Sequence, residues 1–147
     1  MKTFDKILVA VDFSENSNYA FNYALTLARA FNSRLIIVHT TNNLIDHTGF
    51  DVGFFNFEGL EEQIMAGAQG MMEKFCKTGI VDFNNYESFV IAGIPHIEIL
   101  KKAQDENVDL IVMGTHGRSG VDHVLFGSTA ERVLRKAACP VLTVRLP

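Results

Sequence analysis

The sequence of 147 residues lacks the features that would mark a membrane protein or a nucleic-acid-binding protein. No apolar run approaches the roughly 20 residues that a helix needs to span a bilayer, so we expect no membrane insertion. Its 13 basic residues are outnumbered by 17 acidic ones, which gives a net charge of −4. Proteins that bind nucleic acids usually carry a basic stripe, so we expect none as a partner. The composition is that of an ordinary globular protein, and the length predicts one domain over residues 1–147.

Cysteines and targeting signals are equally scarce. Cys76 and Cys139 stand far apart without metal-ligand spacing, so we interpret them as small buried hydrophobic residues. Met1 to Asp5 leads straight into the first apolar run and leaves no room for a signal peptide. These two observations favour a cytoplasmic protein.

The most distinctive stretch runs from Gly114 to Thr129 and has the sequence GTHGRSGVDHVLFGST. It connects a short apolar run, 110–113, to a segment with helical spacing of apolar residues. Glycines in such a connection allow tight turns and close approach of a ligand to the backbone. A glycine-rich turn that enters a helix N-terminus also offers free N–H groups and the positive end of the helix dipole. The stretch therefore predicts an anion site, most often one for phosphate.

Two better-known phosphate motifs are absent. No Lys precedes Ser128, so the stretch is not a P-loop, and no GxGxxG follows the first strand. The spacing is instead G-x2-G-x9-G-[ST], at Gly114, Gly117, Gly127 and Ser128. Ser128 with Glu131 also predicts a capping box at the start of the helix. A glycine-rich connection with such a self-capped helix, and with no ligand, is the alternative.

The whole chain alternates between apolar runs and segments of helical periodicity. This alternation predicts an α/β fold with a parallel sheet and helices on both faces. In such folds ligands bind beyond the carboxyl ends of the strands, where the strand order reverses. We predict strands at Lys6–Val11, Arg34–Thr40, Tyr86–Ile91, Asp109–Met113 and Val141–Arg145, and helices from Ser14 to Asn32, over Glu58–Lys77, from Pro95 to about Asn107, and over Ala130–Ala137.

Apolar spacing also predicts which face of each helix is buried. In the third helix the expected buried positions are Ile97, Leu100 and Ala103. In the first they are Tyr19, Ala20, Tyr23, Ala24, Leu27, Ala28 and Phe31. The segment Asn42–Phe57 has four Phe and no clear period, and we interpret it as a long loop whose rings pack on the body. A lid or a partner-binding patch is the alternative.

The glycine signature, with LIVMGTHGRSG and GSTAERVLRKAACPVLTV around it and KILVAVDFSENS near the start, closely resembles the universal stress protein family. The resemblance covers nearly the whole chain. It implies an open, doubly wound five-stranded sheet in the order 3-2-1-4-5, with the turn after Asp12 across a crevice from Gly114. It also implies adenine-nucleotide binding, because family members that keep the full signature bind ATP. The adenine and ribose would be lined by Ala10, Val11, Thr40 and Met113.

Within the signature, the amides of Gly117, Ser128 and Thr129 would hold phosphates, together with the two hydroxyls. His116 and Arg118 would each add a contact to phosphate, and the alternative for both is a solvated loop residue. Asp12 has three interpretations. It would reach phosphates through Mg²⁺ or Mn²⁺, accept hydrogen bonds from ribose, or cap the following helix.

Three functions compete at this level. The first is a regulatory, stress-response protein that binds ATP, with AMP and cyclic AMP as alternative ligands. The second is an ATPase or phosphotransferase, but the sequence offers no P-loop Lys and no nucleophile paired with a base, so at most slow hydrolysis is expected. The third is a dimeric interaction protein whose glycine loop binds nothing.

With strand order 3-2-1-4-5, Val141–Arg145 is an apolar edge strand, and edges of this kind are normally covered or paired. We expect a homodimer through this strand, as the resemblance also implies. The alternative is a monomer in which the Phe-rich segment Asn42–Phe57 shields this edge.

Overall fold

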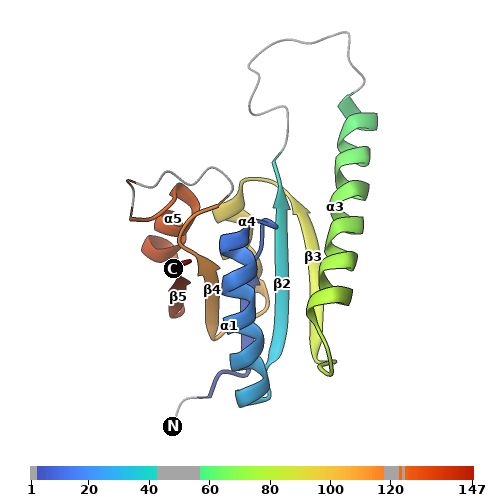
Figure 1. Ribbon diagram of the computed structural model, residues 1–147. Helices are drawn as coiled ribbons and strands as arrows, with labels where there is room; N and C mark the ends of the chain where they lie inside the picture. Colours follow the sequence, from blue (N-terminus) through green and yellow to red (C-terminus); the bar gives the residue numbers. More distant parts are fainter. Residues whose placement is uncertain (1–2, 43–56, 118–122, 124) are drawn as a thin grey trace.

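The computed structural model describes residues 3–42, 57–117, 123 and 125–147, and of Phe57 and Glu58 only the backbone. Its centre is a parallel sheet of five strands in the order β3-β2-β1-β4-β5, as Figure 1 shows. The strands are β1 (Lys6–Ala10), β2 (Arg34–Thr41), β3 (Tyr86–Ala92), β4 (Leu110–Gly114) and β5 (Val141–Val144). The helices are α1 (Glu15–Phe31), α3 (Phe57–Gly79), α4 (Pro95–Asp105) and α5 (Ser128–Lys136). The expected fold class and strand order are confirmed.

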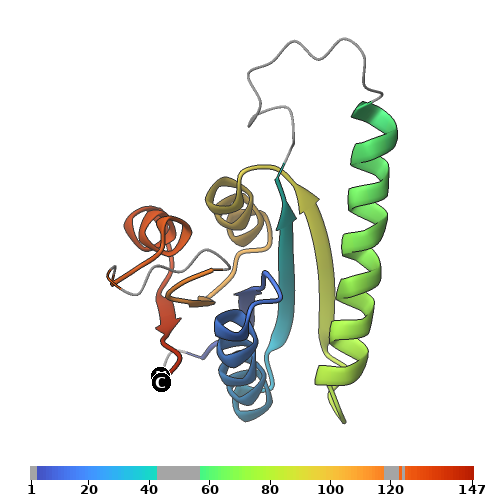
Figure 2. The ribbon, with the colours of Figure 1, turned by 45° about the horizontal axis from the view of Figure 1, so that its top comes forward.

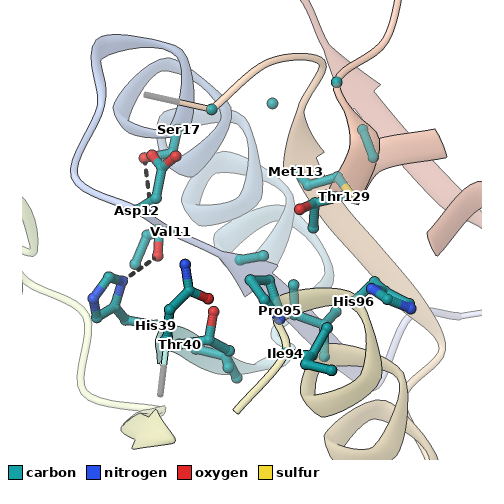
Figure 3. Close-up of a pocket in the computed structure, with 18 of the residues that line it drawn as sticks. Val11, Asp12, Ser17, His39, Thr40, Ile94, Pro95, His96, Met113 and Thr129 are labelled. Atoms are coloured by element: carbon teal, nitrogen blue, oxygen red, sulfur yellow. Dashed lines mark hydrogen bonds between the residues drawn. The ribbon is translucent and has the colours of Figure 1, made fainter. Parts of the chain in front are cut away.

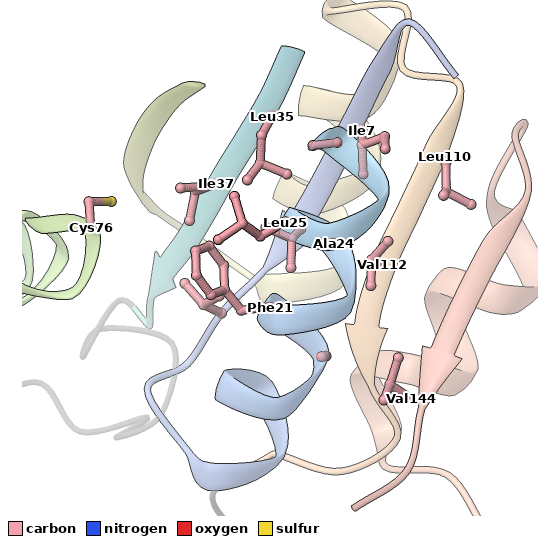
Figure 4. Close-up of a cluster of buried hydrophobic side chains, with 14 of the residues drawn as sticks. Ile7, Phe21, Ala24, Leu25, Leu35, Ile37, Cys76, Leu110, Val112 and Val144 are labelled. Atoms are coloured by element: carbon pink, nitrogen blue, oxygen red, sulfur yellow. The ribbon is translucent and has the colours of Figure 1, made fainter. Parts of the chain in front are cut away.

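Helices cover both faces of the sheet because its central strands are apolar on both sides. Ile7 and Val9 of β1 belong to a core beneath α1 and α3, whereas Leu8 between them belongs to a second core beneath α4 and α5. Figure 2 shows α1 and α3 on one side of the sheet and α4 and α5 on the other. In Figure 4, Phe21, Ala24 and Leu25 of α1 lie over the strands of the first core.

The strand order sets where a ligand could bind. β1 lies between β2 and β4, and the chain after β1 enters α1 on one face. The chain after β4 leads instead to α5 on the opposite face. Two connections that leave neighbouring strands in opposite directions open a crevice at the carboxyl edge of the sheet.

The buried faces of two helices differ from the sequence prediction. In α4, Ile99 is 3% exposed and Ala103 is buried, but Ile97 is 47% exposed, so the prediction for Ile97 was wrong. At 100° per residue, Ile99, Leu100 and Ala103 share one face of the helix and Ile97 lies outside it. Helical spacing alone allows a buried face with Ile97 or one with Ile99. Only the packing of α4 on the sheet selects the face with Ile99.

The same correction applies to α1. Ala20, Ala24 and Ala28 are buried as expected, but Tyr23 and Phe31 are exposed. Phe21 and Leu25 occupy the core in their place. Small alanines form the centre of this face, with Phe21 and Leu25 buried beside them, and Tyr19 and Leu27 are partly buried against the same core.

Other sequence expectations can be checked along the described part of the chain. Cys76 is buried, as expected, and burial raises the pKa of its thiol. Cys139 is half-buried. Among the described residues, no helix is both long and apolar enough to cross a bilayer. The Phe-rich segment Asn42–Phe57 lies almost wholly outside the described residues.

The corrected face of α4 gives a matched test. Ile99→Ala should lower the free energy of unfolding by about 2–5 kcal/mol, because it opens a cavity in the second core. Ile97→Ala removes the same atoms from an exposed position of the same helix and should change stability by no more than about 0.5 kcal/mol. Urea unfolding of both variants measures the difference. Equal losses would contradict the observed orientation of α4.

Candidate functional site

A cavity of about 1060 Å³ opens at the carboxyl edge of the sheet. Its walls come from the ends of β1, β2 and β4, from the starts of α4 and α5, and from α3. Figure 3 shows the strand ends and the starts of α4 and α5 around it. The structure brings together around it every described residue of the sequence-predicted site, namely Ala10, Val11, Asp12, Thr40, Met113, Gly114, His116, Gly117, Gly127, Ser128 and Thr129. Arg118 lies outside the described residues.

The turn after β1 presents Asp12 to this cavity. The backbone N–H of Asp12 donates to Ser17 Oγ at 3.1 Å, and the Ser14 N–H donates to Asp12 Oδ1 at 3.0 Å. Ser14 is the N-cap of α1, and its side chain accepts from the Ser17 N–H, as expected for Ser at this position. Asp12 therefore contributes to the helix entry, and its carboxylate is oriented by the backbone that follows it.

The glycines of the signature meet different demands. A Cβ built on Gly114 would lie 3.2 Å from the backbone of Asn16, so this glycine lets the start of α1 approach β4. A Cβ on Gly117 would lie 2.7 Å from Asp12 Oδ2, so the loop after β4 and the turn after β1 touch at this point. At Gly127 a Cβ would make only an ordinary contact, 3.4 Å from the Thr115 carbonyl oxygen. Of the three, only Gly114 faces backbone closely; the neighbour of Gly117 is the end of a side chain, and Gly127 makes ordinary contacts.

The start of α5 differs from the expected capping box. Gly127, not Ser128, is the N-cap, and it supplies no side-chain cap. The Glu131 N–H donates to the Gly127 carbonyl at 3.0 Å, while the Glu131 carboxylate pairs with Arg135 at 2.8 Å. The prediction failed because Ser128 already has helical geometry as the first residue of α5. A side chain caps best from the extended residue before the helix. The first amides of α5 are thus left without a side-chain cap beside the cavity.

His116 lies on the same loop. Its Nδ1 is 3.0 Å from the hydroxyl of buried Thr115. The Thr115 N–H donates to the Val144 carbonyl, and its carbonyl accepts from the Gly127 N–H at 2.7 Å. Thr115 therefore ties the first part of the glycine loop to β5 and to the cap of α5. The sequence motif gave no role to Thr115.

Residues of α4, α5 and α3 that no sequence pattern predicted also line the cavity. Ile94, Pro95 and His96 line it from the start of α4, and Arg132 lines it from α5, four residues after Ser128. Burial lowers the pKa of His96, and the nearby charges of Arg132 and Lys136 lower it further. Because β3 ends at the same edge as the other parallel strands, the topological rule applied to Tyr86–Ile91 would have found the α4 wall. The α3 wall, with Ile64, Gly67, Ala68 and Met71, carries no motif.

Parallel order, reversal between β1 and β4, and a cavity at that point define an α/β fold with a cavity at its topological switch point. The family model described as universal stress protein family matches residues 3–145, so the chain belongs to the universal stress protein family. It is 30% identical to universal stress protein MJ0577 of Methanocaldococcus jannaschii, over 97% of this chain and 95% of that protein. A Thermus aquaticus universal stress protein is 34% identical over 97% of this chain and 99% of its own length.

Solved structures agree with this assignment. The structure of MJ0577 superposes with a TM-score of 0.87 and covers 99% of both chains. Universal stress protein UspA from Lactobacillus plantarum, at 26% identity, superposes with a TM-score of 0.85 and covers 99% of this chain and 100% of its own.

The two helix starts make a second testable pair. Ser14→Ala removes an observed side-chain cap and should lower the free energy of unfolding by about 1 kcal/mol. Ser128→Ala should change it by no more than about 0.5 kcal/mol, because Gly127 occupies the cap position. Chemical denaturation without nucleotide measures both. If Ser128→Ala lowered the free energy of unfolding as much as Ser14→Ala does, Ser128 would be a capping residue after all.

Proposed function

We propose that this protein is an adenine-nucleotide-binding universal stress protein of the cytoplasm, with ATP as its ligand, and that it acts as a regulatory switch. The observation that carries the proposal is the contact of the Asp12 turn with the Gly117 loop beside the uncapped start of α5. Exposed amides at a helix N-terminus, reached over a glycine, favour a phosphate group. The cavity volume of about 1060 Å³ leaves room for a whole nucleotide.

In this proposal the phosphates lie against Gly117, Gly127 and the amides of Ser128 and Thr129. The Ser128 and Thr129 hydroxyls would donate as well. The base and ribose would lie toward the ends of β1, β2 and β4, where Ala10, Val11, Thr40 and Met113 line the cavity. In Figure 3, Val11 and Thr40 lie on one side of the cavity and Met113 and Thr129 on the other. A flat apolar base fits between such walls, and polar groups at the edge fix its orientation.

Asp12 fits two roles toward that ligand, as an acceptor from ribose hydroxyls or as one ligand of Mg²⁺ or Mn²⁺. Among the described residues, no group of three or more His, Cys, Asp or Glu side chains could hold a metal alone. Mg²⁺ is commonly held by one or two carboxylates together with the phosphates of a substrate. The residues present therefore fit a cation that arrives with the nucleotide, with the Asp12 carboxylate as the protein's ligand.

Relatives support a nucleotide without selecting one. One solved universal stress protein is described as a complex with cAMP, but at 22% identity its likeness to this chain is one of fold. ATP, AMP and cyclic AMP share the base, the ribose and at least one phosphate. ATP is favoured here because Gly117 and Gly127 line the cavity beside the start of α5, where a chain of phosphates gains most from free amides.

Binding of ATP should stabilise the fold. At a free ligand concentration one hundred times the dissociation constant, linkage adds about 2.7 kcal/mol, which raises the melting temperature by several degrees at this size. Thermal melts with ATP, AMP and cyclic AMP, each with and without Mg²⁺, measure the order of preference. Mass analysis of denatured protein detects any nucleotide carried through purification. No shift with any ligand, and no bound nucleotide, would contradict the proposal; fast ATP turnover would make the protein an enzyme.

Gly127→Val is the cleanest test of the phosphate site. The observed backbone of Gly127, φ −68° and ψ 164°, suits any residue, and its Cβ has space, so the fold should persist. The branched side chain would block approach of phosphate and should lower ATP affinity about tenfold or more, equivalent to 1.4 kcal/mol. Gly70→Val on α3 is the control, because Gly70 does not line the cavity and its Cβ would meet nothing within 4 Å. If Gly127→Val bound ATP with the affinity of the parent, Gly127 would not be part of the phosphate site.

We further propose that two copies pair through β5. No described strand pairs with the outer side of β5, so its backbone groups there need a partner or water. The register shows which groups these are. Ile111 N–H donates to the Pro140 carbonyl and Thr115 N–H to the Val144 carbonyl, so alternate residues of β5 face β4. Thr143 lies between them in the alternation, and its N–H therefore points to the outer edge.

Thr143→Pro should convert the dimer to a monomer while β5 stays paired with β4, because it removes only an outward N–H. Thr143→Ala keeps the N–H and should remain dimeric. Sedimentation equilibrium at tens of micromolar decides the question, since the dimer has twice the 16.4 kDa of one chain. A parent protein that sediments as one chain would rule out this interface.

A further inference from the structure

Phe13, directly after Asp12, has an unusual backbone conformation. Four described residues other than glycine have positive φ, and three of them, Asn32, Asp82 and Asn107, are of types that tolerate this conformation. Phe13 is the fourth, with φ 63°. For a bulky residue the left-handed region is strained, and it persists only where the surroundings hold it. In Phe13 the surroundings are two aromatic rings, and the conformation bears on the neighbouring Asp12.

The ring of Phe13 is held between two others. It lies 4.5 Å from the ring of His39 on β2 and 5.7 Å from the ring of Phe75 on α3, measured between centroids. His39 is itself fixed, since its Nδ1 is 2.8 Å from the Val11 carbonyl oxygen and must donate to it (Figure 3). Phe75 packs in turn on Phe21 of the core, at 4.7 Å. Ring packing of this kind contributes about 0.5–1.5 kcal/mol per pair, comparable to the cost of the left-handed conformation.

The conformation of Phe13 decides where Asp12 points. A left-handed residue reverses the direction of the chain after β1, so that the Ser14 N–H returns to Asp12 Oδ1 at 3.0 Å. The other carboxylate oxygen then lies against Gly117, 2.7 Å from the place of a Cβ on that residue. Rotation about φ of Phe13 moves the Ser14 N–H relative to that oxygen, so the observed contact is made with Phe13 at φ 63°. The aromatic packing and the carboxylate orientation are thus linked through one backbone angle.

We propose that Phe13, held by the rings of His39 and Phe75, is the positioning residue that directs the Asp12 carboxylate toward the glycine loop. Phe13 does not touch the ligand in this scheme; it acts through Asp12. The consequence for nucleotide affinity rests on the proposed function, but the orientation of Asp12 can be measured without any nucleotide.

The first experiment uses the nucleotide-free protein. A hydrogen bond to a carboxylate moves an amide proton downfield, so the NMR shift of the Ser14 amide reports the orientation of Asp12. In Phe13→Ala it should move to the value found in Asp12→Ala, which lacks the acceptor. Phe13→Gly should keep more of the parent shift, because glycine adopts positive φ without strain. Phe31→Ala is the control. It removes an exposed ring at the far end of α1, where Phe31 packs on Phe4, and should leave the Ser14 amide shift unchanged.

The second experiment is a double-mutant cycle on Mg-ATP affinity, measured by calorimetry. Phe13→Ala should weaken binding on the order of tenfold in the parent, the scale of the lost conformational preference. In the Asp12→Asn background the same change should alter affinity by less than about twofold, because its effect passes through the carboxylate. If Phe13→Ala proves too unstable to purify, Phe13→Leu takes its place. Because leucine keeps apolar bulk, its Mg-ATP affinity should lie between those of the parent and Phe13→Ala.

The outcomes separate the two proposals. A parent that binds no nucleotide, but whose Ser14 amide shifts as described, would overturn the proposed function and leave the positioning role of Phe13 intact. An unchanged Ser14 shift in Phe13→Ala, or an equal loss of affinity in both backgrounds, would overturn the positioning role, whether or not the parent binds ATP.

Discussion

The site depends on one topological constraint at the centre of the sheet. β1 and β4 are hydrogen-bonded neighbours, yet the chain leaves them toward opposite faces, to α1 and to α5. A crevice must open between two such connections, and it must open at the carboxyl ends of the strands. Here an Asp12 carboxylate oxygen lies across it beside Gly117, 2.7 Å from the place of a Cβ on that residue. The cavity, the cap of α1 and the start of α5 are arranged around that contact.

Much of this arrangement could be predicted from the sequence because it depends on short-range patterns. The apolar runs of β1 and β4 are bounded by polar residues and glycine, and the Ser14 cap follows from the preference of its side chain for extended backbone. The family resemblance supplied the strand order, which no local pattern encodes. The topological rule then placed Asp12 opposite the glycine loop, and the residues predicted from both stretches do line one cavity.

The errors arose where two solutions satisfy the same pattern. Ile97 and Ile99 both lie at helical spacing from other apolar residues, and only packing of α4 on the sheet selects Ile99. Ser128 and Gly127 both suit the start of a helix, and the Gly127 N–H, bound to the Thr115 carbonyl, fixes Gly127 outside it. The α3 wall and Arg132 could not be found at all, because apolar helical residues and a lone cation have no distinctive spacing.

A glycine signature combines demands of the fold with demands of the ligand, and the structure separates them. Packing of α1 favours a glycine at position 114, where a Cβ would lie 3.2 Å from the Asn16 backbone, whereas the neighbour of Gly117 is the end of the Asp12 side chain. Gly127 has room for a Cβ, and its backbone angles suit any residue. Glycine is one of the residues that N-caps favour, so the cap position by itself also accounts for Gly127. Among the described glycines of the signature, Gly127 is the one whose contacts within the chain leave most room for the proposed phosphate beside the start of α5.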